Sequence, residues 1–334
     1  MEHLKPKVYV TRKILEEGLK ILKKAADIKV WDDELPPPKE ILLEEVEDVD
    51  GLLSLLTDKI DAEVMNRARK LKIISNYAVG FDNIDVREAT ARGIMVTNTP
   101  EVLTETTADL AFALLMATAR RIVEADKFVR AGKWKTWEPM LLLGQDIHGA
   151  VLGLIGLGRI GYAVAKRAKG FDMKVLYYDL YRNEKAENEL GLEFVEMDEL
   201  LQKSDFVSIH VPLTPDTKHL INEKTLSMMK KTAILINTAR GPVVDEKALY
   251  KALVNNEIAG AGLDVMDPEP PNINNPLLKL DNIIILPHIA SASIATRTKM
   301  AIMAARNLSA GLKGKTPENL VNKEVLNKIK VDED

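Results

Sequence analysis

Val151-Leu-Gly-Leu-Ile-Gly-Leu-Gly-Arg-Ile-Gly161 is the stretch of sequence that decides the fold. An apolar run leads into the spacing Gly156-x-Gly158-x-x-Gly161, and a helix-like segment that ends at Gly170 follows. Gly156 permits a tight strand-to-helix turn, Gly158 lets the backbone approach a pyrophosphate, and Gly161 lets helix and strand pack closely. The N–H groups at the start of such a helix attract negative phosphates. The stretch therefore predicts the strand, turn and helix of a dinucleotide-binding site.

A second apolar run, Val175-Leu-Tyr-Tyr-Asp179, ends on a carboxylate 18 residues after Gly161. At the tip of the next strand this carboxylate can accept hydrogen bonds from both hydroxyls of an adenosine ribose. Asp179 favours NAD over NADP because a carboxylate repels a 2′-phosphate, although Arg182 nearby acts in the opposite direction. The position of the glycines between a strand and a helix, together with Asp179, favours dinucleotide binding. A plain structural turn and the nucleotide site of a methyltransferase are the alternatives.

The composition is that of a globular chain of about two domains. The chain has 334 residues, of which 46% are hydrophobic, a net charge of −4 and no cysteine. The small negative charge gives no reason to expect nucleic-acid binding, and the lack of cysteine excludes disulfides and zinc–thiolate sites, so we expect no metal. No run approaches the roughly 18 apolar residues of a membrane span, and the first residues lack the apolar core of a secretion signal. We therefore expect a cytoplasmic protein that does not bind membranes.

Strands and helices alternate along both halves of the chain, which predicts parallel sheets. In the first half we expect strands near 8–11, 28–31, 51–56, 72–76 and 93–97. In the second half we expect strands near 151–156, 174–178, 206–209, 233–237, 259–264 and 283–286. An alanine-rich helix over 101–121 connects the two halves, and a similar helix over 293–312 returns to the first domain. The first domain is therefore expected to be discontinuous.

Three of the expected strand ends in the second half carry polar side chains, at the edge where doubly wound sheets bind ligands. Arg240 follows one strand, Asp264 and Glu269 follow the next, and His288 follows the last. These residue types suit hydride transfer to a 2-oxo acid. A histidine protonates the carbonyl, a carboxylate beside it favours the charged imidazole, and an arginine grips the substrate carboxylate.

Each of these residues also has a plainer interpretation. Arg240 could form a surface ion pair, Glu269 could be an exposed loop acid, and His288 could be an ordinary strand-end histidine. His210 also stands at a strand end, and its position alone does not exclude it as the proton donor. The joint occurrence of an arginine, a carboxylate and a histidine at neighbouring strand ends favours the catalytic interpretation.

Along nearly its whole length the chain resembles the D-isomer-specific 2-hydroxyacid dehydrogenases. The motifs that carry the resemblance are Tyr77-Ala-Val-Gly-Phe-Asp-Asn-Ile-Asp85, Leu154-Ile-Gly-Leu-Gly-Arg-Ile-Gly161, Val211-Pro-Leu-Thr214, Asn237-Thr-Ala-Arg-Gly241, Gly262-Leu-Asp-Val265, Pro268-Glu-Pro270 and Leu286-Pro-His-Ile289. Within the family the chain is most similar to the glyoxylate/hydroxypyruvate reductases, through Leu52-Leu-Ser-Leu-Leu-Thr-Asp58, Trp134-Lys-Thr-Trp-Glu-Pro139 and Asn275-Pro-Leu-Leu278.

The resemblance implies an α/β fold with two doubly wound parallel-sheet domains. A Rossmann NAD-binding domain over 102–288 would be inserted in a flavodoxin-like substrate-binding domain formed by 1–101 and 289–334. The implied activity is reduction of glyoxylate or hydroxypyruvate, to glycolate or D-glycerate, by hydride transfer from a nicotinamide cofactor.

The resemblance also implies roles for individual residues. Arg240 matches the substrate-binding arginine, His288 the proton donor and Glu269 the acid that pairs with it. Trp137 matches an aromatic residue that reaches the partner subunit's active site, which implies a homodimer. The other implied substrate contacts are Leu56, Val79, Gly80 and Ser291. The expected cofactor contacts are Thr104, Gly156, Gly158, Arg159, Ile160, Gly161, Asp179, Pro212, Thr217, Thr238, Ala239, Asp264 and Ala290.

Two positions depart from the family pattern. Many reductases of this kind carry serine or glycine followed by arginine where this chain has Asp179-Leu180, and they prefer NADP. We therefore expect NAD as the cofactor and consider NADP less favoured. Ala290 replaces the usual glycine after the catalytic histidine. A phosphoglycerate- or phosphite-type dehydrogenase and an NADH-sensing corepressor-like binding protein remain as alternative functions.

Overall fold

The computed structural model describes residues 5–329 and divides the chain into two compact units. The first unit comprises 1–103 and 292–334, and the second comprises 104–291. The predicted boundaries, after residues 101 and 288, lie within three residues of these. The two ends of the predicted substrate-binding domain, 1–4 and 330–334, lie outside the described residues. The prediction that the chain begins without a secretion signal rests partly on residues 1–4 and stays a prediction. Among the described residues, no helix has the length and apolar character needed to cross a membrane.

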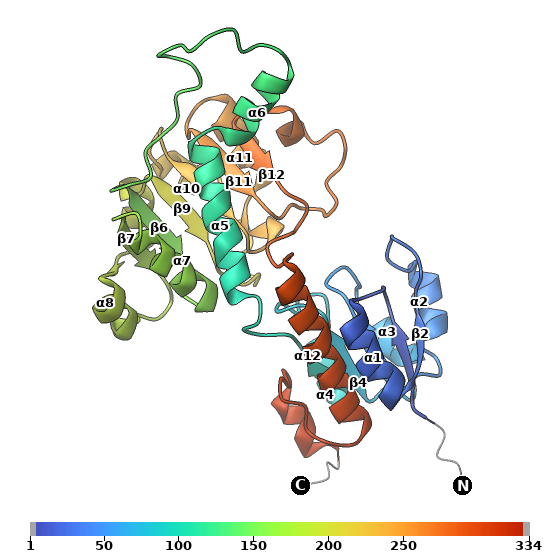
Figure 1. Cartoon of the computed structure of the whole chain (residues 1–334). Coiled ribbons are helices and arrows are strands. Elements are labelled where there is room, and N and C mark those ends of the chain that lie inside the picture. Colours follow the sequence, from blue (N-terminus) through green and yellow to red (C-terminus); the bar gives the residue numbers. More distant parts are fainter. Residues whose placement is uncertain (1–4, 330–334) are drawn as a thin grey trace. The chain divides into compact units, whose positions relative to one another are not determined.

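The first unit contains a five-stranded parallel sheet in the order β2-β1-β3-β4-β5 (Figure 1). Its strands are β1 (Lys7–Val10), β2 (Asp27–Val30), β3 (Gly51–Ser54), β4 (Ile73–Asn76) and β5 (Met95–Thr97). All five lie where the sequence predicts them, and the order is that of flavodoxin-like folds.

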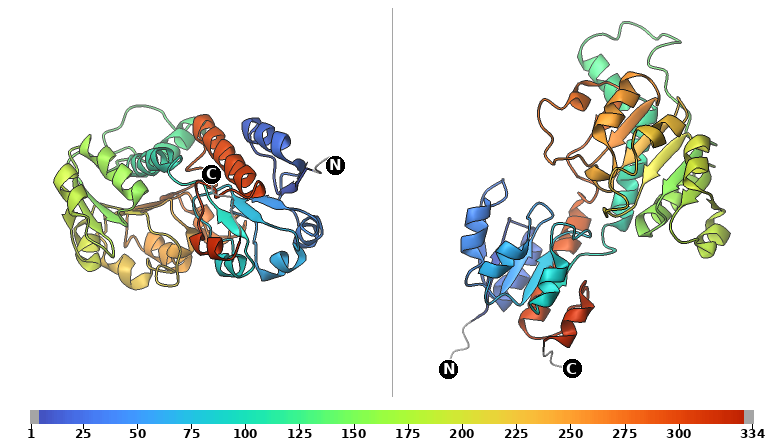
Figure 2. Two further views of the ribbon diagram at one scale, coloured as in Figure 1. Left: turned by 90° about the horizontal axis from the view of Figure 1, so that it is seen from below. Right: turned by 180° about the vertical axis from the view of Figure 1, so that it is seen from behind.

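Helices cover both faces of this sheet. α1 (Glu16–Ala25) and α12 (Ile294–Leu312) pack together on one face, as Figure 2 shows. A Cβ on Gly18 would lie 2.7 Å from the carbonyl oxygen of Ala301, so glycine is what lets these two helices approach so closely. The apolar residues of the other face pack against α2 (Lys39–Glu45), α3 (Ala62–Arg67) and α4 (Val86–Ala91).

The second unit contains a seven-stranded parallel sheet in the order β12-β11-β10-β9-β6-β7-β8. Its strands are β6 (Val151–Ile155), β7 (Lys174–Tyr178), β8 (Glu193–Phe194), β9 (Phe206–Ile209), β10 (Ile234–Asn237), β11 (Gly260–Leu263) and β12 (Ile283–Ile285). Six of them match the predicted strands, and the prediction missed the two-residue β8. The strand order reverses between β6 and β9, and ligands bind at such a switch point in doubly wound folds.

Successive residues of these strands point to opposite faces, and both faces are covered by helices. Leu152 and Leu154 pack with α5 (Thr104–Ala119) and α7 (Arg159–Lys169), whereas Ile155 packs on the opposite face. That opposite face is covered by α9 (Met197–Lys203), α10 (Glu223–Met228) and α11 (Glu246–Val254). Burial on both faces explains why the strands read as continuous apolar runs. The unit also contains α6 (Ile122–Arg130) and α8 (Glu184–Leu190).

Candidate active site

The glycine-rich turn between β6 and α7 has the geometry that a dinucleotide needs. Gly156 has a φ of +93°, and a Cβ there would lie 2.9 Å from the backbone of His210. A Cβ on Gly161 would lie 2.3 Å from the carbonyl oxygen of Gly156. By contrast, a Cβ on Gly158, the N-cap residue of α7, would meet no atom within 4 Å. The turn is therefore closely packed on its inner side and open where a pyrophosphate would approach.

Asp179 directly follows β7, and its carboxylate is hydrogen-bonded to the backbone of this turn. Its Oδ2 accepts a hydrogen bond from the N–H of Leu157 at 2.7 Å, and its Oδ1 accepts one from the N–H of Leu180 at 2.7 Å. A carboxylate oxygen has a second lone pair, so both oxygens can still accept from ribose hydroxyls. A shallow pocket of about 500 Å³ opens beside it, lined by Leu157, Gly158, Asp179, Tyr181, Arg182, Asn183 and Glu184.

Arg182, the residue that complicates the choice of cofactor, is bound to Glu187 of α8. Its Nε and Nη2 donate to the two carboxylate oxygens at 2.8 and 2.7 Å. The buried Tyr177 hydroxyl donates to the same carboxylate at 2.6 Å. The Arg182 guanidinium, together with the Tyr177 hydroxyl, lowers the pKa of the Glu187 carboxyl to about 2, so Glu187 is ionised at any physiological pH. The positive charge of Arg182 is thus already paired.

The structure joins two of the three predicted catalytic side chains. Nδ1 of His288 lies 2.7 Å from Oε2 of Glu269, and the side chains are 23% and 28% exposed. The other oxygen of Glu269 accepts from the N–H of Met266 at 3.1 Å. This hydrogen bond leaves Nε2 of His288 as the ring nitrogen that can hand a proton to a substrate.

Asp264 fixes the turn on which His288 stands. Its carboxylate is completely buried at the end of β11 and accepts the N–H groups of Ile289 and Ala290, each at 2.8 Å. Burial raises the pKa of the Asp264 carboxyl, and these two hydrogen bonds act against that rise. The carbonyl of Asp264 also accepts from the N–H of His288 at 2.9 Å. The observed task of Asp264 is structural, and its contact with a nicotinamide carboxamide stays a prediction.

Arg240 follows β10 in a loop that is shaped by Asn237. The Asn237 amide donates to the carbonyl of Arg240 at 2.9 Å, and its oxygen accepts from the N–H of Ala239 at 3.0 Å. A Cβ on the next residue, Gly241, would lie 1.9 Å from the carbonyl oxygen of Met266. Glycine therefore lets the arginine loop touch the backbone of the segment that leads to Glu269. The sequence analysis predicted no role for Asn237, although an asparagine at a strand end is typical of such turns.

His210 is unsuited to donate a proton at neutral pH. Burial lowers its pKa to about 4, and its Nε2 lies 2.9 Å from the hydroxyl of Ser208. Its backbone packs against Gly156 instead. These features favour His288 over His210 as the proton donor, and the role of His288 stays a prediction.

The remaining expected cofactor contacts lie along the carboxyl edge of the same sheet. The hydroxyl of Thr238 is buried and has no hydrogen-bond partner among the described residues. It is therefore able to form a hydrogen bond with a bound ligand. The hydroxyl of Thr217 instead closes its own turn by donating to the carbonyl of Pro212 at 2.6 Å. Arg159 and Ile160 form the first turn of α7, Thr104 begins α5, and the half-buried Ala239 and buried Ala290 lie in the loops described above.

The expected substrate contacts of the first unit lie in two loops that are tied together. Leu56 follows β3, and Val79 and Gly80 follow the neighbouring β4; Leu56 and Gly80 are half-buried. The amide of Asn83 donates to the carbonyls of Leu55 and Asp58, each at 3.0 Å. The amide of Asn76 donates to the carbonyl of Gly80 at 2.9 Å and to the side-chain oxygen of Asn83 at 3.0 Å. The sequence analysis predicted no role for either asparagine, because a hydrogen bond between two loops leaves no spacing pattern.

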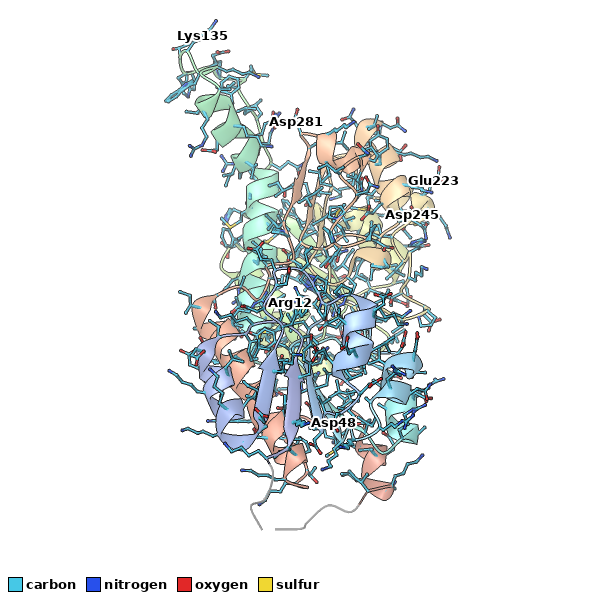
Figure 3. The ribbon with its side chains drawn as sticks, turned by 90° about the vertical axis from the view of Figure 1, so that its right-hand side faces the viewer. Arg12, Asp48, Lys135, Glu223, Asp245 and Asp281 are labelled. Carbon is cyan, nitrogen blue, oxygen red and sulfur yellow. The ribbon has the colours of Figure 1, made fainter. Side chains whose placement is uncertain are left out.

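Trp137 lies in the loop that follows α6 and is 79% exposed. Figure 3 shows Lys135 at the far end of this loop. Ser291, the last residue of the second unit, is half-buried. Among the described residues, no group of three or more metal-ligating side chains is present.

Known proteins match this chain over most of its length. The family of the D-isomer specific 2-hydroxyacid dehydrogenase NAD binding domain matches residues 112–290. The glyoxylate reductase of Korarchaeum cryptofilum is 60% identical over 324 residues, which cover 97% of this chain and 98% of that protein. The glyoxylate reductase of Pyrococcus horikoshii is 56% identical over 327 residues, which cover 97% and 98%.

Solved structures are also similar to this chain over nearly its whole length. A protein from Thermus thermophilus superimposes with a TM-score of 0.89 at 48% identity, covering 94% of this chain and 99% of its own. The NADPH-dependent glyoxylate/hydroxypyruvate reductase of Sinorhizobium meliloti, in complex with NADP and malonate, superimposes with a TM-score of 0.82 at 34% identity. That likeness covers 96% of this chain and 98% of the reductase.

The packing of the glycine-rich turn predicts opposite effects for two alanine substitutions. Gly161→Ala should lower the free energy of unfolding by about 1–3 kcal/mol, because its Cβ would overlap the carbonyl of Gly156. Gly158→Ala should leave stability nearly unchanged but raise the Kd for NADH about tenfold, because its methyl group occupies the open side of the turn. Urea unfolding and fluorescence titration with NADH measure the two effects. Equal NADH affinity in Gly158→Ala and wild type would contradict the placement of the pyrophosphate.

Proposed function

The chain belongs to the D-isomer-specific 2-hydroxyacid dehydrogenase family, and we propose that it reduces glyoxylate and hydroxypyruvate with NADH as the preferred hydride donor. The observation that carries this proposal is the 2.7 Å contact between His288 and Glu269, beside the loop of Arg240. An imidazole backed by a carboxylate can protonate the oxygen of a carbonyl that receives a hydride. The products would be glycolate and D-glycerate, and we place the enzyme in the cytoplasm.

Each of the three side chains has a distinct task in the proposed reaction. The nicotinamide cofactor, when bound, supplies the hydride. His288, with Nδ1 hydrogen-bonded to Glu269, donates the proton on Nε2 to the carbonyl oxygen, and Glu269 stabilises the imidazolium before the transfer. Arg240 pairs with the substrate carboxylate through its planar guanidinium. Leu56, Val79, Gly80 and Ser291 complete the proposed set of substrate contacts.

The preference for NAD rests on two charges at the adenosine end. Asp179 would lie against the ribose, where its carboxylate repels a 2′-phosphate. Arg182 is the cation that could offset this repulsion, and Glu187 already neutralises it through two hydrogen bonds. Both features support NAD over NADP.

A homodimer is supported by the apolar surface around α6. No residue of α6 is buried, and the segment from 122 to 143 exposes large hydrophobic side chains. They are Ile122, Val123, Val129, Trp134, Trp137, Met140 and Leu143. A soluble chain rarely leaves such a patch uncovered, and aromatic and methionine side chains are enriched at interfaces. We propose that a second copy of the chain covers this patch and receives Trp137 at its active site.

Replacing His288 tests the proposed reaction directly. In His288→Ala, kcat with glyoxylate should fall by about 10²–10⁴-fold, because the general acid is gone. The Kd for NADH should stay within about twofold of the wild-type value. Stopped-flow turnover and fluorescence titration supply both numbers. A variant that keeps most of the wild-type kcat would refute the acid role, and a wild type that binds NADH without turnover would point to a binding module.

Replacing Asp179 tests the choice of cofactor. Asp179→Ser should raise kcat/KM for NADPH relative to NADH about 100-fold, since a repulsive carboxylate is replaced by a neutral donor. Adding Glu187→Gln should raise the ratio further, because Arg182 is then released toward the 2′-phosphate. Steady-state kinetics with both cofactors measure the ratio. A ratio unchanged in the double variant would mean that neither charge selects the cofactor.

Mixing two impaired variants tests the dimer and the role of Trp137 together. If Trp137 completes the partner subunit's site, Trp137→Ala should raise KM for glyoxylate about tenfold. Mixed dimers of Trp137→Ala and His288→Ala should regain activity at low glyoxylate, because one of their two sites has both residues intact. Sedimentation velocity confirms the assembly state. A monomeric wild type, or no recovery on mixing, would refute the proposal.

A further inference from the structure

One carboxylate outside the predicted site binds both ends of the loop that carries Glu269. Glu246 is the first residue of α11, directly after the capping residue Asp245. Its Oε1 accepts from the N–H of Asp267 at 2.7 Å, and its Oε2 accepts from the side-chain amide of Asn275 at 2.7 Å. Asn275 in turn accepts from the N–H of Leu277 at 3.0 Å. The segment between Asp267 and Asn275 is therefore closed by a single side chain.

This loop needs an external anchor because it has no regular structure of its own. The residues from 267 to 270 are exposed and form neither a helix nor a strand. Glu269 lies two residues after Asp267 and touches His288 at 2.7 Å. A partly exposed ion pair contributes about 0–1 kcal/mol, which is too little to order a loop by itself.

The segment that provides the anchor also carries Arg240. Between Arg240 and Glu246 the chain forms a short 3₁₀ helix, Gly241–Val243, and the cap of α11. The segment touches the Glu269 loop at two places. One is the close approach of Gly241 to the carbonyl of Met266, and the other is the Glu246 carboxylate.

We propose that Glu246 is a positioning residue that holds Glu269 against His288 and keeps this pair in register with the Arg240 loop. The inference rests on the proposed function, because the pair it positions is the proposed proton donor. Glu246 acts through Asp267 and Asn275 and needs no contact with substrate. Other titratable groups line the hollow next to it, and their charges must be held constant in any test: His219, Asp245, Lys247, Tyr250, Lys251 and Asp267.

Glu246→Gln is the variant that isolates this role, because glutamine has the same shape but only one acceptor oxygen. The amide can accept from Asp267 or from Asn275, but not from both through separate oxygens. With glyoxylate, kcat should fall about tenfold. This loss is smaller than the rate acceleration of about 10²–10⁴-fold that a correctly positioned general acid contributes, because His288 itself is still present. The Kd for NADH and the melting temperature should stay close to those of the wild type. Asn275→Ala removes one of the two donors and should have a smaller effect in the same direction.

The NMR spectrum of His288 separates positioning from a loss of structure. When Glu269 moves away, the imidazole loses its hydrogen-bond partner, so the ring resonances of His288 should shift in Glu246→Gln while those of the other histidines stay in place. The chain has five histidines, and their spectra can be recorded without any substrate.

Glu223→Gln is the matched control. Glu223 is also the first residue of a helix, α10, and follows a capping side chain, that of Asn222. It is exposed and lies on the neighbouring helix, as the labels of Glu223 and Asp245 in Figure 3 show. This variant changes the net charge by the same amount and should match the wild type in kcat, melting temperature and the His288 ring resonances.

Two results would overturn the inference. One is a Glu246→Gln enzyme with wild-type kcat and unshifted His288 ring resonances. The other is a parallel loss of melting temperature, NADH affinity and kcat, which would show only a structural role. If the wild type itself turns over none of the 2-oxo acids, the proposed function fails instead. The NMR spectra of His288 still decide the inference in that case, because they need no turnover.

Discussion

The arrangement of the site depends on the hydrogen bonds between the buried carboxylate of Asp264 and the backbone of the His288 turn. This carboxylate accepts the two N–H groups that follow His288, while the carbonyl of Asp264 accepts the N–H of His288. His288 has a φ of +55°, a left-handed conformation that costs energy in any residue with a side chain. A buried charge without hydrogen bonds would cost far more, so the turn and the carboxylate stabilise each other. The imidazole is thereby presented at one orientation.

The first unit uses the same principle with neutral groups. Asn76 and Asn83 bond to carbonyls in the two loops that carry Leu56 and Gly80, so each loop restrains the other. Side-chain amides can supply both donors and acceptors at once, which suits them to joining loops that have no ladder hydrogen bonds. Loops fixed in this way lose little further entropy when a ligand binds, and this loss is a main cost of binding.

Much of the fold could be predicted from the sequence, because it follows from local periodicity. Of the twelve strands within residues 5–329, eleven were expected, since apolar runs between turn residues specify them, whereas the two residues of β8 are too few to show a period. Asp179 could be singled out because the glycine pattern indicates how far along the chain the next strand ends, and the structure places its carboxylate beside the glycine-rich turn. Asn237 and Glu246 were missed because each acts through contacts that only folding creates. The pairing of Arg182 with Glu187 likewise depends on how α8 returns toward β7, which no spacing rule describes.

Burial separates the groups that shape the site from those that would do chemistry. Asp264, Asn76 and Asn237 are buried and hydrogen-bonded to loop backbone, whereas His288 and Glu269 remain partly exposed. A proton donor must recover its proton from water after each cycle, so it cannot be sealed from solvent. His210 has a different setting, because burial lowers its pKa to about 4 and its ring contacts the hydroxyl of Ser208 instead of a carboxylate. Of these two histidines, His288 is the one with a carboxylate partner, and the partial exposure of that pair suits the exchange of protons with water.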